Sequence, residues 1–188
     1  MFDEARIRAS VASIIEAIGE DPKREGLADT PKRVAEMYNE LFMGLGKNPR
    51  EELKVGYELG HREMVILKDI PFYSMCEHHF LPFYGVVHVG YIPNEEGRVV
   101  GISKLARVVE IIAKRPQIQE RMATDVADAI ADGLKCEGVA VVIEAEHLCM
   151  VMRGIKKPGA SVITSALRGR FRSHAASRAE FMSLIRSQ

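Results

Sequence analysis

The segment EMVILKDIPFYSMCEHHFLPFYGVVHVGYI, residues 63–92, carries a signal for a β-sheet and the densest group of reactive side chains in the chain. Residues 63–70 are short and rich in β-branched types, and residues 83–92 alternate and are rich in Val and Tyr, so each predicts a strand. Residues 71–79 between them are predicted to form a loop. This loop holds a thiol, a carboxylate and two imidazoles, on Cys76, Glu77, His78 and His79. The first strand therefore leads through a candidate metal-binding loop into the second.

Helical patterns flank this segment on both sides. Apolar residues recur at steps of three and four in four stretches, which predict helices over residues 3–18, 30–42, 103–115 and 118–134. Thr30 and Ser103 are the expected N-caps of the second and third helices. Two more strands are expected at residues 139–149 and 161–167, and a last helix at about residues 173–185.

The order of these elements favours an α+β fold with an antiparallel sheet. Two pairs of strands are separated by two helices, and two more helices precede them. Four strands make a small sheet whose long edges, rich in Val and Ile, invite pairing with another subunit. We expect residues 1–60 to form a helical region, residues 61–188 to form the sheet-bearing domain, and the protein to be an oligomer.

The composition excludes several classes of protein. The 188 residues include 26 Lys and Arg and 26 Asp and Glu, and this balance argues against a nucleic-acid or membrane-surface binder. No apolar run approaches the length of about 20 residues that spans a bilayer, and the N-terminus lacks the pattern of a signal peptide. We therefore expect a cytoplasmic protein. Three cysteines in a reducing compartment favour metal binding or catalysis over disulfides.

A second group of metal-binding side chains follows about seventy residues later. Cys76 and His79 have the short spacing that lets one turn offer two ligands, and Cys149 would add a second thiolate, a set that suits zinc. On a strand, His147 and Cys149 would face the same side, so His147 would lie beside the ion. The alternatives are a buried core thiol at Cys149 and a core histidine at His147. We read Cys136 as structural.

A cationic group could bind an anion such as a phosphate. Ser103, Lys104 and Arg107 open a predicted helix, whose N-terminus carries free N–H groups and a positive dipole. Arg153 follows Cys149 closely, and Arg33 lies in the first turn of an earlier helix. A solvated charged surface is the alternative for each. Gln119 and Glu120 could recognise an amidine-like edge such as that of guanine, although a surface acid is the default for Glu120.

Together these stretches resemble the GTP cyclohydrolase I family closely. The matching residues, in the order of the family, are Asp29 to Arg33, Cys76 to Phe80, Tyr91 to Pro93, Gly101 to Arg107, Arg115 to Arg121, His147 to Cys149, and Arg153 with Gly154. The resemblance implies a tunnelling fold, with a four-stranded antiparallel sheet, two helices between the strand pairs and added N-terminal helices. It also implies a toroidal homo-oligomer, commonly a decamer of two pentamers, with active sites shared between subunits.

The resemblance implies the conversion of GTP and water into 7,8-dihydroneopterin triphosphate and formate, the first step of pterin and tetrahydrofolate biosynthesis. In this sequence Cys76, His79 and Cys149 would bind Zn2+, which activates the water that attacks C8 of the purine. His147 and His78 would transfer protons, and Ser103 would assist the later sugar rearrangement. The residues expected to contact the substrate GTP are Glu120 and Gln119 at guanine, Ser103, Lys104, Arg107, Arg153 and Arg33 at the triphosphate, and Glu77 as an orienting or polar contact.

One position departs from the family pattern. Some members carry a second basic residue three positions after the one that matches Arg33, whereas this chain has Glu36, which puts that phosphate contact in doubt. Two rival interpretations are a different tunnelling-fold enzyme, such as the nitrile-reducing queuosine enzyme, and a zinc or nucleotide-binding protein without catalysis. The His147 and Cys149 pair argues against the first.

Overall fold

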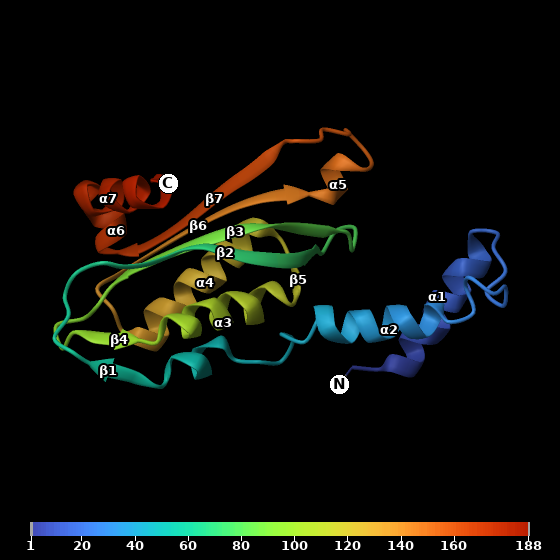
Figure 1. Ribbon diagram of the computed structural model, residues 1–188, viewed down its shortest axis with the longest axis horizontal. Coiled ribbons are helices and arrows are strands. Elements are labelled where there is room, and N and C mark those ends of the chain that lie inside the picture. Colours follow the sequence, from blue (N-terminus) through green and yellow to red (C-terminus); the bar gives the residue numbers. More distant parts are fainter. Residues whose placement is uncertain (1, 188) are drawn as a thin grey trace. The chain divides into compact units, whose positions relative to one another are not determined.

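The computed structural model describes residues 2–187, and its chain divides into two compact units between Met43 and Gly44. The first unit is a pair of helices, α1 Glu4–Ala17 and α2 Thr30–Leu41, coloured blue in Figure 1. Asp3 caps α1 by accepting a hydrogen bond from the N–H of Arg6 at 2.9 Å. The N-cap of α2 is Asp29 and not Thr30 as predicted, and Pro31 lies in the first turn, where a missing N–H breaks no helical bond.

The second unit holds the sheet and also includes residues 44–60, which the sequence had placed with the helical region. Its elements are η1 Pro49–Leu53, β1 Gly56–Glu58, β2 Val65–Cys76, β3 Pro82–Ile92, β4 Arg98–Val100, α3 Ile102–Ala113, β5 Pro116–Gln117, α4 Gln119–Leu134, β6 Gly138–His147, α5 Leu148–Val151, β7 Ser161–Gly169, α6 Arg170–Ser173 and α7 Ala175–Arg186. The main sheet has the order β5-β2-β3-β6-β7. Its four long strands are antiparallel, as predicted, and the two-residue β5 adds a parallel partner to β2.

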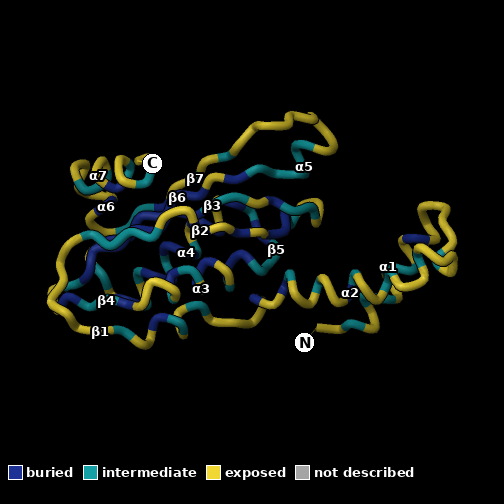
Figure 2. Tube along the Cα trace, viewed as in Figure 1, coloured by how far each residue is buried: buried dark blue, intermediate teal, exposed yellow. Residues whose placement is uncertain are grey.

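Apolar side chains cover both faces of this sheet. On one face α3 and α4 pack against alternate residues such as Val87, Val89 and Tyr91, each fully buried. On the other face, Phe171 and Phe181 of α6 and α7 form a smaller cluster. Figure 2 shows the buried backbone concentrated between the sheet and the α3–α4 layer. Among residues 2–187, no helix has both the length and the apolar character needed to cross a membrane.

Strand β2 is longer than the sequence predicts. It runs through Pro71 to Cys76, where residues 71–79 were expected to form a loop, so that prediction was wrong for most of the segment. Pro71 pairs with Val86 of β3, and among the described strands only β5 lies on the other side of β2, at Met75 and Cys76. A proline is tolerated at residue 71 because the side of β2 away from β3 is an unpaired strand edge there, where no backbone N–H is needed for the ladder. The metal loop is therefore reduced to a tight turn.

Two further local predictions were wrong. Strand β6 ends at His147, and Cys149 lies in the short helix α5 that follows, so the two residues do not share a strand face. The N-cap of α3 is Gly101, which places Ser103 inside the first turn. In both cases the chain turns one or two residues earlier than the local pattern indicates.

Candidate active site

Cys76, His79 and Cys149 come together at one end of the sheet. Cys76 is the buried last residue of β2, His79 lies in the turn after it, and Cys149 belongs to α5. One ligand atom from each lies within 4.8 Å of the others. Burial and then the neighbouring Cys76 thiol raise the pKa of Cys149, because two thiolates side by side repel each other. A divalent cation would relieve that repulsion, so this donor set fits a metal ion.

The turn between β2 and β3 fixes how these ligands are presented. The N–H of Cys76 donates to the carbonyl of Leu81 at 2.9 Å, and the N–H of Phe80 donates to the carbonyl of Cys76 at 2.8 Å. The ring planes of His78 and His79 are nearly perpendicular, at 82°, and the ring centroids are 6.4 Å apart, so the two imidazoles are oriented differently. Arg153 donates from Nη1 to Nε2 of His79 at 2.9 Å.

His147 lies in a second, more buried group at the same end of the sheet. Its ring stacks on Phe83 with centroids 4.7 Å apart and planes 3° from parallel. Its Nε2 lies 2.7 Å from Oε1 of Gln119, the first residue of α4. Burial lowers the pKa of His147, and the negative charge of Glu120 nearby opposes that shift. The imidazole is therefore held rigidly and is favoured in its neutral form.

Gln119 is 1% exposed, and its amide is used within the chain. Nε2 donates to the carbonyls of Ile143 and Val162 at 3.1 and 2.8 Å. Two carbonyl partners identify this atom as the NH2 group, so Oε1 faces His147. Because Oε1 only accepts, Nε2 of His147 carries the hydrogen in this arrangement and Nδ1 keeps the lone pair.

The cations predicted at α3 form a separate group. Lys104 Nζ lies 3.1 Å and Arg107 Nη1 lies 3.5 Å from Oε2 of Glu52 in η1. The hydrogen bond from Lys104 is the main cause of a lowered pKa at Glu52. Ser103 is exposed beside them. A carboxylate thus already occupies the position where these two cations converge.

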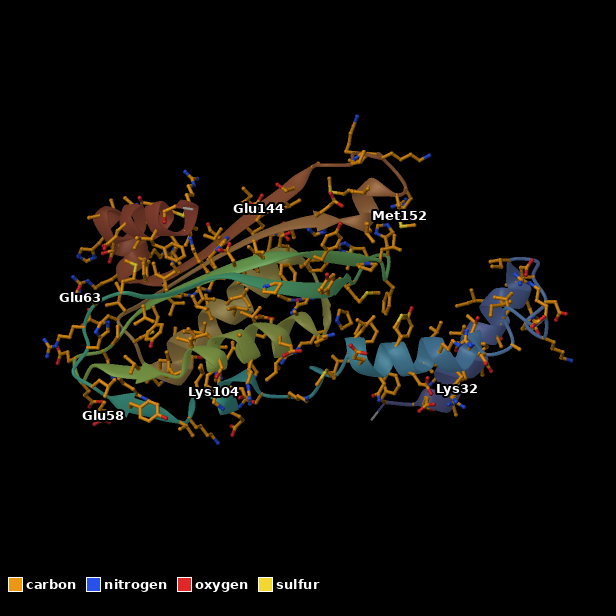
Figure 3. All side chains as sticks on the ribbon, in the orientation of Figure 1. Lys32, Glu58, Glu63, Lys104, Glu144 and Met152 are labelled. Carbon is orange, nitrogen blue, oxygen red and sulfur yellow. The ribbon has the colours of Figure 1, made fainter. Side chains whose placement is uncertain are left out.

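This cationic group lies at the opposite end of α3 from the thiols. The Ser74 hydroxyl donates to the carbonyl of Ala113 at 2.7 Å, which ties the last residue of α3 to β2 just before Cys76. With a rise of about 1.5 Å per residue, the Lys104 backbone lies about 14 Å from that end. In Figure 3, Lys104 lies well apart from Met152, which directly follows α5. Arg33 belongs to the first unit, where it pairs with Asp29 at 3.4 Å, and Glu36 lies 3.9 Å from Lys32.

Four residues of these groups were given no role from the sequence. Phe83 and Glu52 looked like ordinary core and surface residues, and only contacts across the fold reveal them. Gln117 and Arg121 lie in the segment from Arg115 to Arg121 that matches the family pattern, but the sequence did not show which residues they contact. Arg121 forms an ion pair with Glu77, whose pKa is lowered mainly by the Arg121 hydrogen bond.

Fold and site together define an α+β protein with a candidate metal centre of two thiols and an imidazole beside a rigidly held histidine. The sequence profile described as GTP cyclohydrolase I matches residues 7–186. A protein named GTP cyclohydrolase 1 from Dehalococcoides mccartyi is 77% identical over 185 residues, which is 98% of each chain. Another of that name from Thermoanaerobacter pseudethanolicus is 59% identical over the full length of both chains.

The chain therefore belongs to the GTP cyclohydrolase I family and is an enzyme of that class. Among solved structures, an archaeosine synthase QueF-Like protein in the apo form aligns with a TM-score of 0.44 and 23% identity. The alignment covers 56% of this chain and 93% of the QueF-Like chain. That likeness is too weak to bear on fold or function. Family membership decides against the rival interpretations, a queuosine-type enzyme and a binding protein without catalysis.

Proposed function

We propose that this enzyme converts GTP and water into 7,8-dihydroneopterin triphosphate and formate, the first step of pterin and folate biosynthesis. The observation that carries the proposal is the convergence of Cys76, His79 and Cys149 within 4.8 Å, next to the stacked imidazole of His147. Purine ring opening requires an activated water and a group that moves protons, and these residues can supply both at one place.

Zinc is the metal we assign to this centre. Two thiolates and one imidazole are ligands that zinc prefers, and three protein ligands leave the open position of a catalytic site. When bound, zinc would supply Lewis-acid chemistry and a nucleophile at neutral pH. The chain itself would orient the purine and handle the protons.

His147 is the proton-handling residue with the most defined geometry. Gln119 and Phe83 hold its ring, which leaves Nδ1 as the atom that accepts or returns a proton. His78, exposed in the turn beside the ligands, would act as the second such group. Glu120, exposed and close enough to influence His147, would accept two hydrogen bonds from the guanine edge. Gln119 would contribute to that recognition chiefly by fixing the site around it.

The triphosphate would be held by Ser103, Lys104, Arg107, Arg153 and Arg33. GTP carries about four negative charges, and charge-assisted hydrogen bonds from several cations would balance them. Because Lys104 and Arg107 lie at the end of α3 remote from Cys76, we infer that a neighbouring subunit contributes them to each metal centre. Glu52 would release both cations when phosphate arrives.

This sharing agrees with a tunnelling-fold toroid, which we propose to be a decamer of two pentamers. Among the described strands, β7 pairs only with β6, and β2 has only the two-residue β5 beyond β3. Each subunit thus offers two long strand edges that can continue the sheet into its neighbours. Ten chains of 21.0 kDa would give a particle of about 210 kDa, which light scattering measures directly.

Incubation with GTP, followed by formate release and by the fluorescence of the oxidised pterin, tests the proposed reaction. Formate and pterin should appear together and stop when a chelator removes the metal. Replacing His147 by Ala should keep the metal and abolish formate release, whereas replacing Glu120 by Ala should weaken GTP binding. Activity that persists in metal-free protein would refute the metal-dependent mechanism.

A further inference from the structure

Arg121 donates three side-chain hydrogen bonds near the metal centre, yet the proposed reaction gives it no role. It lies in the first turn of α4. Its Nη2 donates to Glu77 Oε2 and, at 3.1 Å, to the carbonyl of Pro116. Its Nε donates to Oε1 of Gln117 at 3.0 Å. One guanidinium therefore connects the turn that carries the ligands to the short segment before α4.

That segment is itself firmly fixed. Gln117 is 1% exposed, and its Nε2 donates to the carbonyl of Ile112 at 3.1 Å. Its backbone pairs with Cys76 in the parallel β5–β2 ladder. Its carbonyl also accepts a hydrogen bond from the N–H of Glu77 at 3.0 Å. Gln117 is thus a rigid support packed directly beside the first ligand.

Glu77 is the link between this support and the ligands. It follows ligand Cys76 directly and precedes ligand His79 by two residues. Its main chain is bound to Gln117 and its side chain to Arg121, so the turn is held at both points. His78 and His79 are exposed and lie outside the strands, where the turn is also held by its own backbone hydrogen bonds and by the contact of Arg153 with His79.

We propose that Arg121 is a positioning residue for the metal centre, which it pre-organises by clamping Glu77 against Gln117. The inference rests on the proposed metal site and adds residues that do not touch the ion. Groups that orient metal ligands typically contribute about 10- to 100-fold to metal affinity. An arginine suits this task because its planar fork serves three acceptors at once, whereas a lysine ammonium cannot match that geometry.

The test measures zinc affinity by competition with a chromophoric chelator at fixed pH, with urea unfolding of the metal-free protein in parallel. Arg121→Met should weaken zinc binding about tenfold, and Arg121→Lys should recover only part of the loss. Arg168→Met is the matched control, because Arg168 is another partly exposed arginine that pairs with a carboxylate, Asp128 at 2.6 Å. Its zinc affinity should stay within twofold of the wild type.

Glu77→Gln provides an independent arm. It should weaken zinc binding in the same direction, and the double variant with Arg121→Met should bind about as weakly as the worse single variant, because both remove one clamp. If Arg121→Met fails to fold, the zinc affinity of Glu77→Gln alone tests the inference. Wild-type affinity in Glu77→Gln or a folded Arg121→Met would overturn the inference and leave the metal site intact. A wild-type protein that binds no zinc would instead refute the proposed function.

Discussion

Replacing Gln119 by Leu tests whether the buried amide really holds the histidine of the site. Leucine has a similar size, so the change removes hydrogen bonds with little change in packed volume. Besides the longer contact with Thr164, three groups lose a hydrogen bond, namely the buried carbonyl of Ile143, the half-buried carbonyl of Val162 and the Nε2–H of the half-buried His147. Water cannot replace that partner easily, because Gln119 is 1% exposed.

The size of the effect follows from those three bonds. A net contribution of about 1 kcal/mol each predicts that the free energy of unfolding falls by about 3 kcal/mol. Such a loss is a substantial part of the total stability of about 5–15 kcal/mol that is typical of a domain. The protein should still fold, but the His147 ring should lose its fixed orientation and formate release should fall.

Urea unfolding at equal protein concentration measures the first quantity, and a formate assay measures the second. Thr164→Val is the matched control, because its hydroxyl is the most distant of the three acceptors of the Gln119 NH2 group, at 3.2 Å. That control should cost about 1 kcal/mol or less. If Gln119→Leu changed the free energy of unfolding by less than 1 kcal/mol and left formate release unchanged, the assigned hydrogen-bond arrangement would be wrong.

Two other predictions concern charge. Glu52→Gln removes the carboxylate that neutralises Lys104 and Arg107, so inorganic tripolyphosphate should bind about two- to fivefold more tightly at low salt. A calorimetric titration measures this gain in affinity, which should shrink as the salt concentration rises. Equal affinity of wild type and variant at low salt would contradict the role of Glu52. Burial lowers the pKa of His88, so the unfolded chain binds that proton more readily, and stability should fall as the pH drops below about 6.5 towards the folded pKa. His88→Gln should flatten that slope in urea titrations at several pH values, and an unchanged slope would assign it to other groups.

Much of this fold could be predicted from local pattern. The two N-terminal helices, the four long strands and the two helices between the strand pairs all follow from apolar periodicity. The errors occur where long-range contacts override a local signal. Pro71 marks a break in most contexts, yet the open edge of β2 accommodates it. Leu148 to Val151 are apolar like the first half of β6, so nothing local indicates the helical turn that carries Cys149.

The candidate site divides in the same way. Metal-ligand chemistry at Cys76, His79 and Cys149 is visible from residue type and spacing, and the structure confirms that these side chains meet. The support around them is not visible, because the contacts of Arg121 with Glu77 and of Glu52 with Lys104 join segments more than forty residues apart. Residue type alone does not identify a carboxylate as a partner of one particular cation.

We expect this enzyme to release formate from GTP only when one metal ion is held by Cys76, His79 and Cys149. The most direct measurement is zinc content and formate release on the same samples of wild type and Cys149→Ser. The wild type should hold about one zinc per chain and release formate, and the variant should lose both. A Cys149→Ser enzyme that still released formate at the wild-type rate without bound metal would contradict this expectation.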